Sequence, residues 1–238
     1  MIDKIRADAL EALSVVPDGA SIAIGGFGLT GVPVLLCDAL CELDRRDLHI
    51  VSNNAGIDCT GVGRLVAEGR IRKFTGSFPS NKAFLAVLQT GRVELELVPQ
   101  GTLAERLRAA GAGIRAFYTP TSAWTDLATG NYPSRYDRDG REIAWLPPKD
   151  VRVFEGTACV LETALVTDFA LVKSHRADRL GNLAFRLASR NFNVPAAMAG
   201  RVTFCESQSI VEVGAIDPDA VHVPGIFVQH VVHSPDRR

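Results

Sequence analysis

Short apolar segments and amphipathic segments alternate along the first half of the chain. The apolar segments, which we expect to be strands, cover residues 21–27, 47–54, 71–78, 93–100 and 115–120. The amphipathic segments carry apolar residues at helical spacing, and we expect helices over 2–16, 34–43, 61–69, 81–91 and 102–111. Strands that alternate with helices in this way are typical of a parallel sheet with crossover helices.

The alternation breaks between residues 119 and 148. Asp139-Gly140 stands there between two short β-prone stretches, which predicts a β-hairpin. Strand patterns resume over 151–162, 168–175, 201–207 and 225–232, with a loop expected over 176–193. We therefore predict one α/β domain over residues 1–238, built on a doubly wound, mostly parallel open sheet with a β-hairpin excursion at about 120–150.

Composition narrows the possible partners. The 238 residues are 47% hydrophobic and carry a formal net charge of -1, so the chain can bury a core and offers nucleic acid no basic surface. No uncharged apolar run is long enough to span a membrane, and the first residues lack the apolar centre of a signal peptide. The five cysteines form no C-x-x-C pair, which is typical of reduced thiols. These features predict a cytoplasmic protein with no nucleic-acid or membrane partner.

A glycine run follows the first of the expected strands. Its G-x-G-x-x-G spacing over residues 26–31 fits the fingerprint of dinucleotide-binding proteins. However, the next strand ends in 52–54, Ser-Asn-Asn, without the acidic residue that would bind a ribose. Pro33 also lacks an amide close to where a phosphate would lie. The run therefore does not predict an NAD site, and the histidines show no zinc-binding spacing, so no metal site is predicted.

The residues around this run form a longer signature. Asp18-Gly19 precedes three apolar residues, 22–24, and Gly25-Gly26-Phe27, Gly31 and Pro33 follow in order. This signature resembles that of the A (alpha) subunits of the family I coenzyme A transferases, of the 3-oxoacid and 3-oxoadipate CoA-transferase type. The resemblance continues through residues 51–58, 93–121, 167–193 and 214–232, so it covers nearly the whole chain.

The resemblance implies transfer of coenzyme A from an acyl-CoA, with succinyl-CoA expected, to a 3-oxo acid such as acetoacetate or 3-oxoadipate. In that family a glutamate attacks the thioester and carries CoA between two half-reactions, which is ping-pong chemistry. The family places this glutamate in a Glu-Asn motif on the B (beta) subunit, and the present chain has no Glu-Asn pair. We therefore expect an enzyme that is active only with its B subunit, in an αβ or α2β2 assembly. The CoA thioester would be a substrate, with no permanently bound cofactor.

The candidate site residues follow strands. Gln100-Gly101 lies between an expected strand and an expected helix, where free amides can bind an anion. The resemblance gives this pair a catalytic role in the oxyanion region. Asn53 and Asn54 end a strand, a position typical of ligand contacts and also of turns, and the resemblance implies that they bind substrate. It assigns close packing, inside the domain or against a partner subunit, to Gly25, Gly26, Phe27, Gly28, Gly31 and Pro33.

Other acidic and basic residues have simpler interpretations. Two Glu-Gly pairs, 68–69 and 155–156, are expected at turns rather than in catalysis. Glu105 and Arg106 fall within an expected helix, and charges of that kind usually lie on a solvated face. Neither group therefore predicts a nucleophile.

Residues 122–126 depart from the family pattern. Ser122 and Trp124 stand where relatives commonly have glycine. Trp124 could narrow an acyl pocket, pack on a partner or form a buried anchor of the excursion. The departure leaves open a second hypothesis, a diverged non-catalytic scaffold subunit of a complex with different acyl-CoA chemistry. A third, a sugar-phosphate isomerase of similar architecture, requires an acid/base carboxylate for which the sequence offers no convincing candidate.

Overall fold

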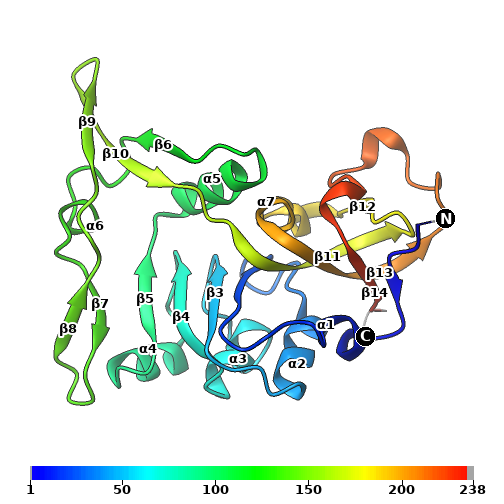
Figure 1. The fold of residues 1–238 in the computed structure, drawn as a ribbon, viewed down its shortest axis with the longest axis horizontal. Helices are drawn as coiled ribbons and strands as arrows, with labels where there is room; N and C mark the ends of the chain where they lie inside the picture. The colour runs from blue at the N-terminus through cyan, green and yellow to red at the C-terminus, as the bar shows by residue number, and fades with distance from the viewer. Residues whose placement is uncertain (1, 235–238) are drawn as a thin grey trace.

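The computed structural model describes residues 2–234 and is organised around one nine-stranded sheet (Figure 1). Its strands are β1 Ile5–Arg6, β2 Ser21–Ile24, β3 Leu48–Ser52, β4 Ile71–Gly76, β5 Glu94–Leu97, β11 Thr167–Asp178, β12 Leu183–Ala184, β13 Gly200–Val211 and β14 His230–His233. The order across the sheet is β1-β14-β13-β11-β2-β3-β4-β5, and β12 pairs with β11 beside this path. All of these pairs are parallel except β11 with β12. The predicted α/β fold is confirmed.

The sheet is wound in two directions from its middle. Successive strands β2 to β5 run outward to one edge, and β11, β13 and β14 run outward to the other. The direction therefore changes between β2 and β11. In open sheets of this kind, ligands bind beyond the carboxyl ends of the strands near that change of direction.

Helices cover both faces of the sheet. One layer contains α1 Ala9–Leu13, α2 Val34–Glu42, α3 Val62–Ala67 and α4 Lys82–Gln89, and the other contains α5 Gln100–Gly111 and α7 Asn193–Ala199. Side chains alternate between the layers along each strand, so that Ile22 and Ile24 pack in the first and Ala23 packs in the second. Burial on both faces explains why the central strands β2 and β3 are mostly apolar in the sequence.

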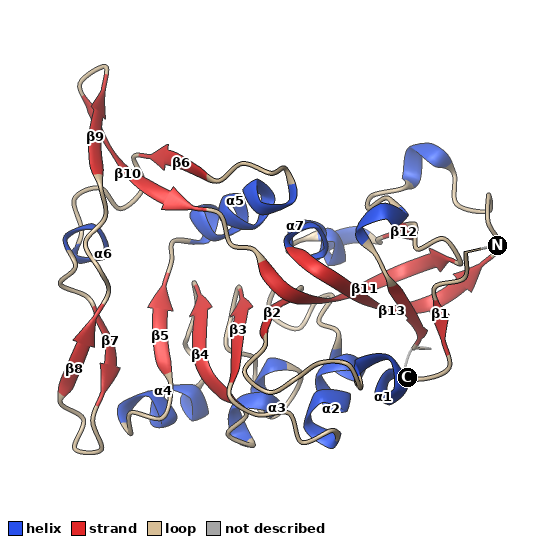
Figure 2. Cartoon of the chain, viewed as in Figure 1, coloured by secondary structure: helices blue, strands red, loops and turns tan. Residues whose placement is uncertain are grey.

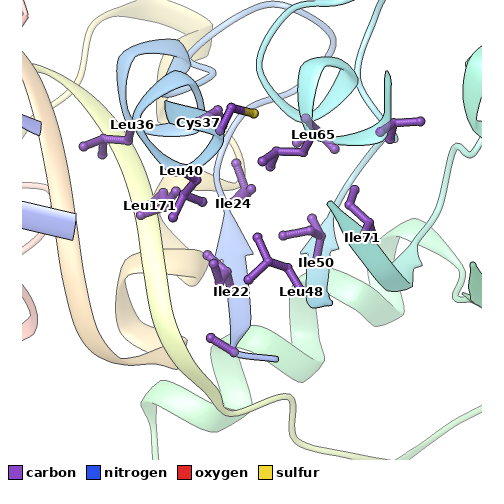
Figure 3. Packing of buried hydrophobic residues seen from close by; sticks show 14 of the residues in the cluster. Ile22, Ile24, Leu36, Cys37, Leu40, Leu48, Ile50, Leu65, Ile71 and Leu171 are labelled. Carbon is purple, nitrogen blue, oxygen red and sulfur yellow. The ribbon is translucent and has the colours of Figure 1, made fainter. Parts of the chain in front are cut away.

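The core beneath α2 and α3 fixes the central strands (Figure 3). Leu36 and Leu40 of α2 and Leu65 of α3 meet Ile24 and Ile50 of the sheet, and each of the five is at most 1% exposed. Full burial of one such side chain stabilises a fold by about 1.5–3 kcal/mol. This packing holds in place the strands whose carboxyl ends carry the predicted site.

An antiparallel excursion lies between α5 and β11. β6 Ala116–Thr119, β10 Thr157–Thr163 and β9 Val151–Phe154 form one small sheet, and β7 Pro133–Tyr136 pairs with β8 Glu142–Trp145 in another. Both small sheets lie at one end of the molecule (Figure 2), with the short helix α6 Asp126–Thr129 between them. The predicted hairpin at Asp139-Gly140 is confirmed. Trp124 is 85% exposed, so the interpretation of this side chain as a buried anchor is wrong.

The strand expected over 225–232 begins only at His230, after the 3-10 turn Gly225–Phe227, and two further segments differ from the prediction. The helix expected over 2–16 is reduced to α1, and Ile5–Arg6 instead pairs with β14 at the other end of the chain. The loop expected over 176–193 contains β12 and a 3-10 turn, and α7 follows it unpredicted. Both errors arise because pairing with distant strands and burial against them, not local periodicity, determine these segments. In the described part of the chain, no helix has both the length and the apolar character to cross a membrane.

Candidate active site at the carboxyl edge of the sheet

Asn53 and Gln100 meet at the carboxyl edge of the sheet. Parallel strands bring the residues that follow them to a common edge. The Gln100 Nε2 donates a hydrogen bond of 2.8 Å to the Asn53 Oδ1. Asn53 is 1% exposed, whereas Gln100 is partly exposed. Two residues predicted from separate motifs therefore form one polar contact with access to solvent.

Backbone hydrogen bonds beyond the strand ends hold Asn53. Its carbonyl accepts from the amides of Ser77 at 3.2 Å and Phe78 at 2.9 Å, both of which follow β4. The Val98 amide, which follows β5, donates to the Gly76 carbonyl at 3.0 Å. The parallel ladder thus continues to the edge, so Asn53 is positioned by neighbouring strands rather than by a free loop.

Gln100 and Gly101 are the first residues of helix α5, which begins two residues earlier than the helix predicted over 102–111. The Leu103 amide donates to the Pro99 carbonyl at 2.8 Å and is the first amide of the helix with a carbonyl acceptor. The amides of Gln100, Gly101 and Thr102 precede it and lie at the positive end of the helix. Gly101 is exposed, and a Cβ placed there would have no other heavy atom within 4 Å. This end of the helix can therefore receive a negatively charged group from outside the chain.

The glycine run forms a tight loop between β2 and α2. Phe27 and Thr30 exchange two backbone hydrogen bonds of 3.0 Å, and Gly28 between them has a φ of +59°. Gly26 has a φ of +113°, and a Cβ there would lie 2.7 Å from the Val32 side chain. Both positions favour glycine for conformation, and Gly26 also requires it for space, because a Cβ on Gly28 would meet no other heavy atom within 4 Å. The loop leads into α2, for which Pro33 is the N-cap.

Asn193, at the start of α7, ties this loop to the sheet. Its side chain is fully buried, and its Nδ2 donates to the carbonyls of Gly31 at 2.9 Å and Ser189 at 2.8 Å. Its Oδ1 accepts from the Lys173 amide of β11 at 2.9 Å. A Cβ on Gly25 would lie 2.0 Å from that Oδ1, so Gly25 makes room for the amide. The sequence alone did not indicate this role, and its only signal was the place of Asn193 in a segment shared with the family.

Asn54 points into a turn. Its Oδ1 accepts from the Gly56 amide at 3.1 Å, which is the local bond typical of asparagine in turns. Asn54 also lines a narrow crevice of about 10 Å³ with Gly26 and Gly28 of the glycine loop. The structure thus separates the two asparagines: Asn53 contacts Gln100, whereas Asn54 shapes the loop beside it. Substrate binding by either side chain stays a prediction.

Several apolar side chains around the edge are exposed. Phe27 is 48%, Leu29 58%, Ile57 42% and Phe78 49% exposed. Leu29 and Ile57 line the same crevice, and Phe78 forms a bridge to Asn54. Isolated exposed apolar residues are common, but a group of them beside a polar site is typical of an interaction surface. We call these four residues the apolar rim.

A buried ionic network lies between α5, β5 and the excursion. The Arg106 side chain is 8% exposed, and it donates to the Glu96 Oε1 at 2.8 Å and to the Thr163 carbonyl at 2.7 Å. Burial raises the pKa of Glu96, but the charge and hydrogen bond of Arg106, with Lys73 nearby, outweigh it and lower that pKa to about 2. The expectation of a solvated Arg106 is therefore wrong, because the end of β10 lies against this part of the helix.

The two Glu-Gly pairs lie at turns, as predicted. Glu155-Gly156 joins β9 to β10 with positive φ at both residues, and Glu68 caps the end of α3. Both glutamates are exposed. Within residues 2–234, no group of three or more His, Cys, Asp or Glu side chains is arranged to hold a metal ion.

Comparison with known proteins decides the family. The family model described as coenzyme A transferase matches residues 6–234. The chain belongs to the coenzyme A transferase family. The resemblance inferred from the glycine signature is thereby confirmed, and the chain is part of a CoA-transferase enzyme.

Relatives in this family are similar over almost the whole chain. A protein of Mycobacterium tuberculosis (strain ATCC 25618 / H37Rv), named as the A subunit of a probable succinyl-CoA:3-ketoacid coenzyme A transferase, is 49% identical over 236 residues, covering 99% of this chain and 95% of that protein. A mitochondrial succinyl-CoA:3-ketoacid coenzyme A transferase of Rattus norvegicus is 43% identical over 233 residues, which cover 98% of this chain but 45% of the rat protein. The chain therefore matches nearly all of one relative and part of a longer chain in the other.

Solved transferases share the fold. An acyl-CoA transferase from E. coli O157:H7, in a thioester complex with CoA, superposes with a TM-score of 0.83 at 21% identity, covering 99% of this chain and 48% of that one. Glutaconate coenzyme A-transferase from Acidaminococcus fermentans superposes with a TM-score of 0.79 at 18% identity, covering 98% of this chain and 76% of that one. At these identities the likeness concerns the fold alone, and it agrees with the doubly wound sheet described above.

Proposed function

We propose that this chain is the A (alpha) subunit of a CoA-transferase that moves CoA from succinyl-CoA to a 3-oxo acid such as acetoacetate or 3-oxoadipate. The observation that carries the proposal is the 2.8 Å contact between Gln100 and Asn53 at the carboxyl edge of the sheet. It occurs in a chain 49% identical over 236 residues to a protein named as one subunit of such a transferase. The CoA thioester is a substrate, and no cofactor is bound permanently.

The chemistry is a double displacement through a glutamate of the B subunit. Its carboxylate attacks the thioester carbonyl, and the tetrahedral intermediate collapses to an acyl-glutamyl anhydride and the CoA thiolate. The thiolate then attacks the glutamyl carbonyl, which releases the first acid and leaves a glutamyl-CoA thioester. The incoming acid reverses these steps.

The amides of Gln100 and Gly101 supply charge stabilisation in this scheme. They lie at the free, positive end of a twelve-residue helix, aimed where an oxyanion can approach. Asn53 holds the Gln100 side chain and thereby the first turn of the helix. Donors that are already fixed need no reorganisation as charge develops on the carbonyl oxygen.

The structure supports a nucleophile from outside this chain. Near α5, the partly buried Glu96 and the buried Glu162 are engaged in ion pairs with Arg106 and Lys149. A carboxylate held in an ion pair is less available to attack a carbonyl. The apolar rim at Phe27, Leu29, Ile57 and Phe78 offers a surface for the B subunit beside Gln100, in an αβ or α2β2 assembly.

Exchange of CoA between succinyl-CoA and acetoacetate tests the proposal. The chain is assayed alone, the B-type partner alone, and the two together after co-expression. We expect turnover only from the pair. Turnover by this chain alone would place a nucleophile on it. If a stably assembled pair transferred no CoA to acetoacetate, 3-oxoadipate or other 3-oxo acids, a scaffold role would be favoured.

A further inference from the structure

A basic cavity opens where the sheet changes direction. The cavity has a volume of about 400 Å³ and lies beside the glycine loop. It is lined by Thr30, Gly31, Lys173, Ser174, His175, Arg186, Leu187, Ala188, Ser189 and Gln208. These lining residues, all in the described part of the chain, include a lysine, an arginine and a histidine but no aspartate or glutamate. The buried Glu206 beneath the cavity pairs with Lys173, so Arg186 supplies its uncompensated positive charge.

Lys173 and His175 are held in place along β11. They lie two positions apart, so both side chains project from the same face of the strand. The Lys173 Nζ lies 3.2 Å from Glu206 on β13, and the His175 Nδ1 lies 2.8 Å from the Gln208 Oε1. The Glu206 carboxylate is also bonded by the Leu36 amide at 3.1 Å, and it is 1% exposed beneath the cavity. Lys173 is 25% exposed and has further N–H donors to offer a ligand.

The opposite wall carries backbone strain. Leu187 has a φ of +52°, and 87% of it is exposed although it is a large apolar residue. A left-handed backbone at such a residue is unfavourable and persists where surrounding contacts impose it, often at ligand sites. Here it follows Arg186, which is exposed at the mouth of the cavity.

The position of the cavity agrees with a ligand site. It lies at the boundary of β2 and β11, where the winding reverses and where open α/β sheets bind ligands. Along the sheet, β11 is two strands from β3, and Asn53 directly follows β3. The cavity is thus near the candidate active site but distinct from it.

We propose that this cavity binds a phosphate group, with Lys173 and Arg186 as its cations. Two sources share this chemistry, the phosphates of a CoA substrate and free inorganic phosphate. The first source rests on the proposed function, and the second does not.

Calorimetric titration of the full chain in complex with its partner tests the site, at fixed ionic strength. The probes are inorganic phosphate, CoA and 3′-dephospho-CoA. Arg186→Gln and the charge reversal Arg186→Glu are compared with Arg190→Gln, because Arg190 is also exposed on the same segment but does not line the cavity. We expect at least about a tenfold loss of phosphate affinity for both Arg186 variants and less than about twofold for Arg190→Gln.

The outcomes separate the two sources. If the Arg186 variants also lose affinity for CoA, and lose less for 3′-dephospho-CoA, the site is assigned to the substrate. If they lose affinity for inorganic phosphate alone, the site is assigned to the free ion. Equal affinities of wild type and both Arg186 variants for all three probes overturn the proposal. If CoA exchange is intact in that case, the cavity alone is refuted and the proposed function stands.

Discussion

In the proposed mechanism Gln100 acts through the first turn of α5, and Asn53 holds its side chain by a hydrogen bond. The contact joins the end of β3 to the start of α5 through side-chain amides alone. Asn53 is itself fixed by backbone bonds to the residues after β4. The arrangement transfers the rigidity of the sheet to a helix end that would otherwise be free to fray.

Gln100→Ala is predicted to slow formation of the glutamyl-CoA thioester by about 10²-fold, because small displacements of fixed donors are costly in catalysis. Asn53→Ala should have a similar effect, and the double variant should be little worse than either single one, since both remove the same contact. Rapid-quench measurement of the first half-reaction gives these rates. Gln89→Ala, at an exposed position that ends α4, is the matched control. Additive losses in the double variant would show that the two residues act independently.

At the scale of elements, α5 is anchored by Arg106. Its side chain is buried among Glu96, Glu162 and the Thr163 carbonyl, whereas Arg108 on the same helix is 50% exposed and pairs only with Glu105 among the contacts described. Removing one partner of a buried ion pair leaves an uncompensated charge, so Arg106→Met is predicted to lower the free energy of unfolding by about 3 kcal/mol. Arg108→Met should change it by less than about 1 kcal/mol. Urea unfolding measures both, and equal effects would contradict the burial of Arg106.

The same network predicts a pH dependence. The folded-state pKa of Glu96, about 2, lies below its ordinary value of 4.5. The folded state therefore binds this proton less readily than the unfolded state, and the stabilisation is present above about pH 4.5 and lost as the pH falls toward 2. Denaturation of wild type and Glu96→Gln across this range should show a stability difference that shrinks with acid. A constant difference would mean that Glu96 is not held as a carboxylate.

The elements differ in how far the sequence predicts them. Apolar residues identify β2 and β3 because those strands are buried on both faces, whereas β5 at the sheet edge was found by its alternating pattern. Gln100 was expected between a strand and a helix, and it is the first residue of α5. Asn193 was missed, since its role depends on hydrogen bonds to the backbone of Gly31 and Lys173, which lie far from it in the sequence. Arg106 was misjudged because a helical arginine has the same local pattern whether solvent or β10 lies against it. Local periodicity in the sequence cannot predict which polar groups the topology of the fold brings into contact.

For the whole molecule, the carboxyl edge is expected to face the B subunit. Leu29→Lys or Phe78→Lys on the apolar rim should weaken the complex at least about tenfold, because a charge would be buried in an apolar contact. Leu85→Lys provides the control, since Leu85 is 41% exposed on α4, away from this edge. Sedimentation or titration of the purified subunits measures the affinity. Unchanged affinity for both rim variants would place the partner elsewhere.

Intact-mass spectrometry of the complex after brief exposure to succinyl-CoA tests most directly whether the nucleophile lies on the partner. We predict that the partner subunit gains the mass of a CoA thioester, that this chain keeps its mass, and that the adduct decreases in the Gln100→Ala complex. A CoA adduct on this chain, or an assembled complex that forms no adduct while it transfers CoA, would contradict this mechanism.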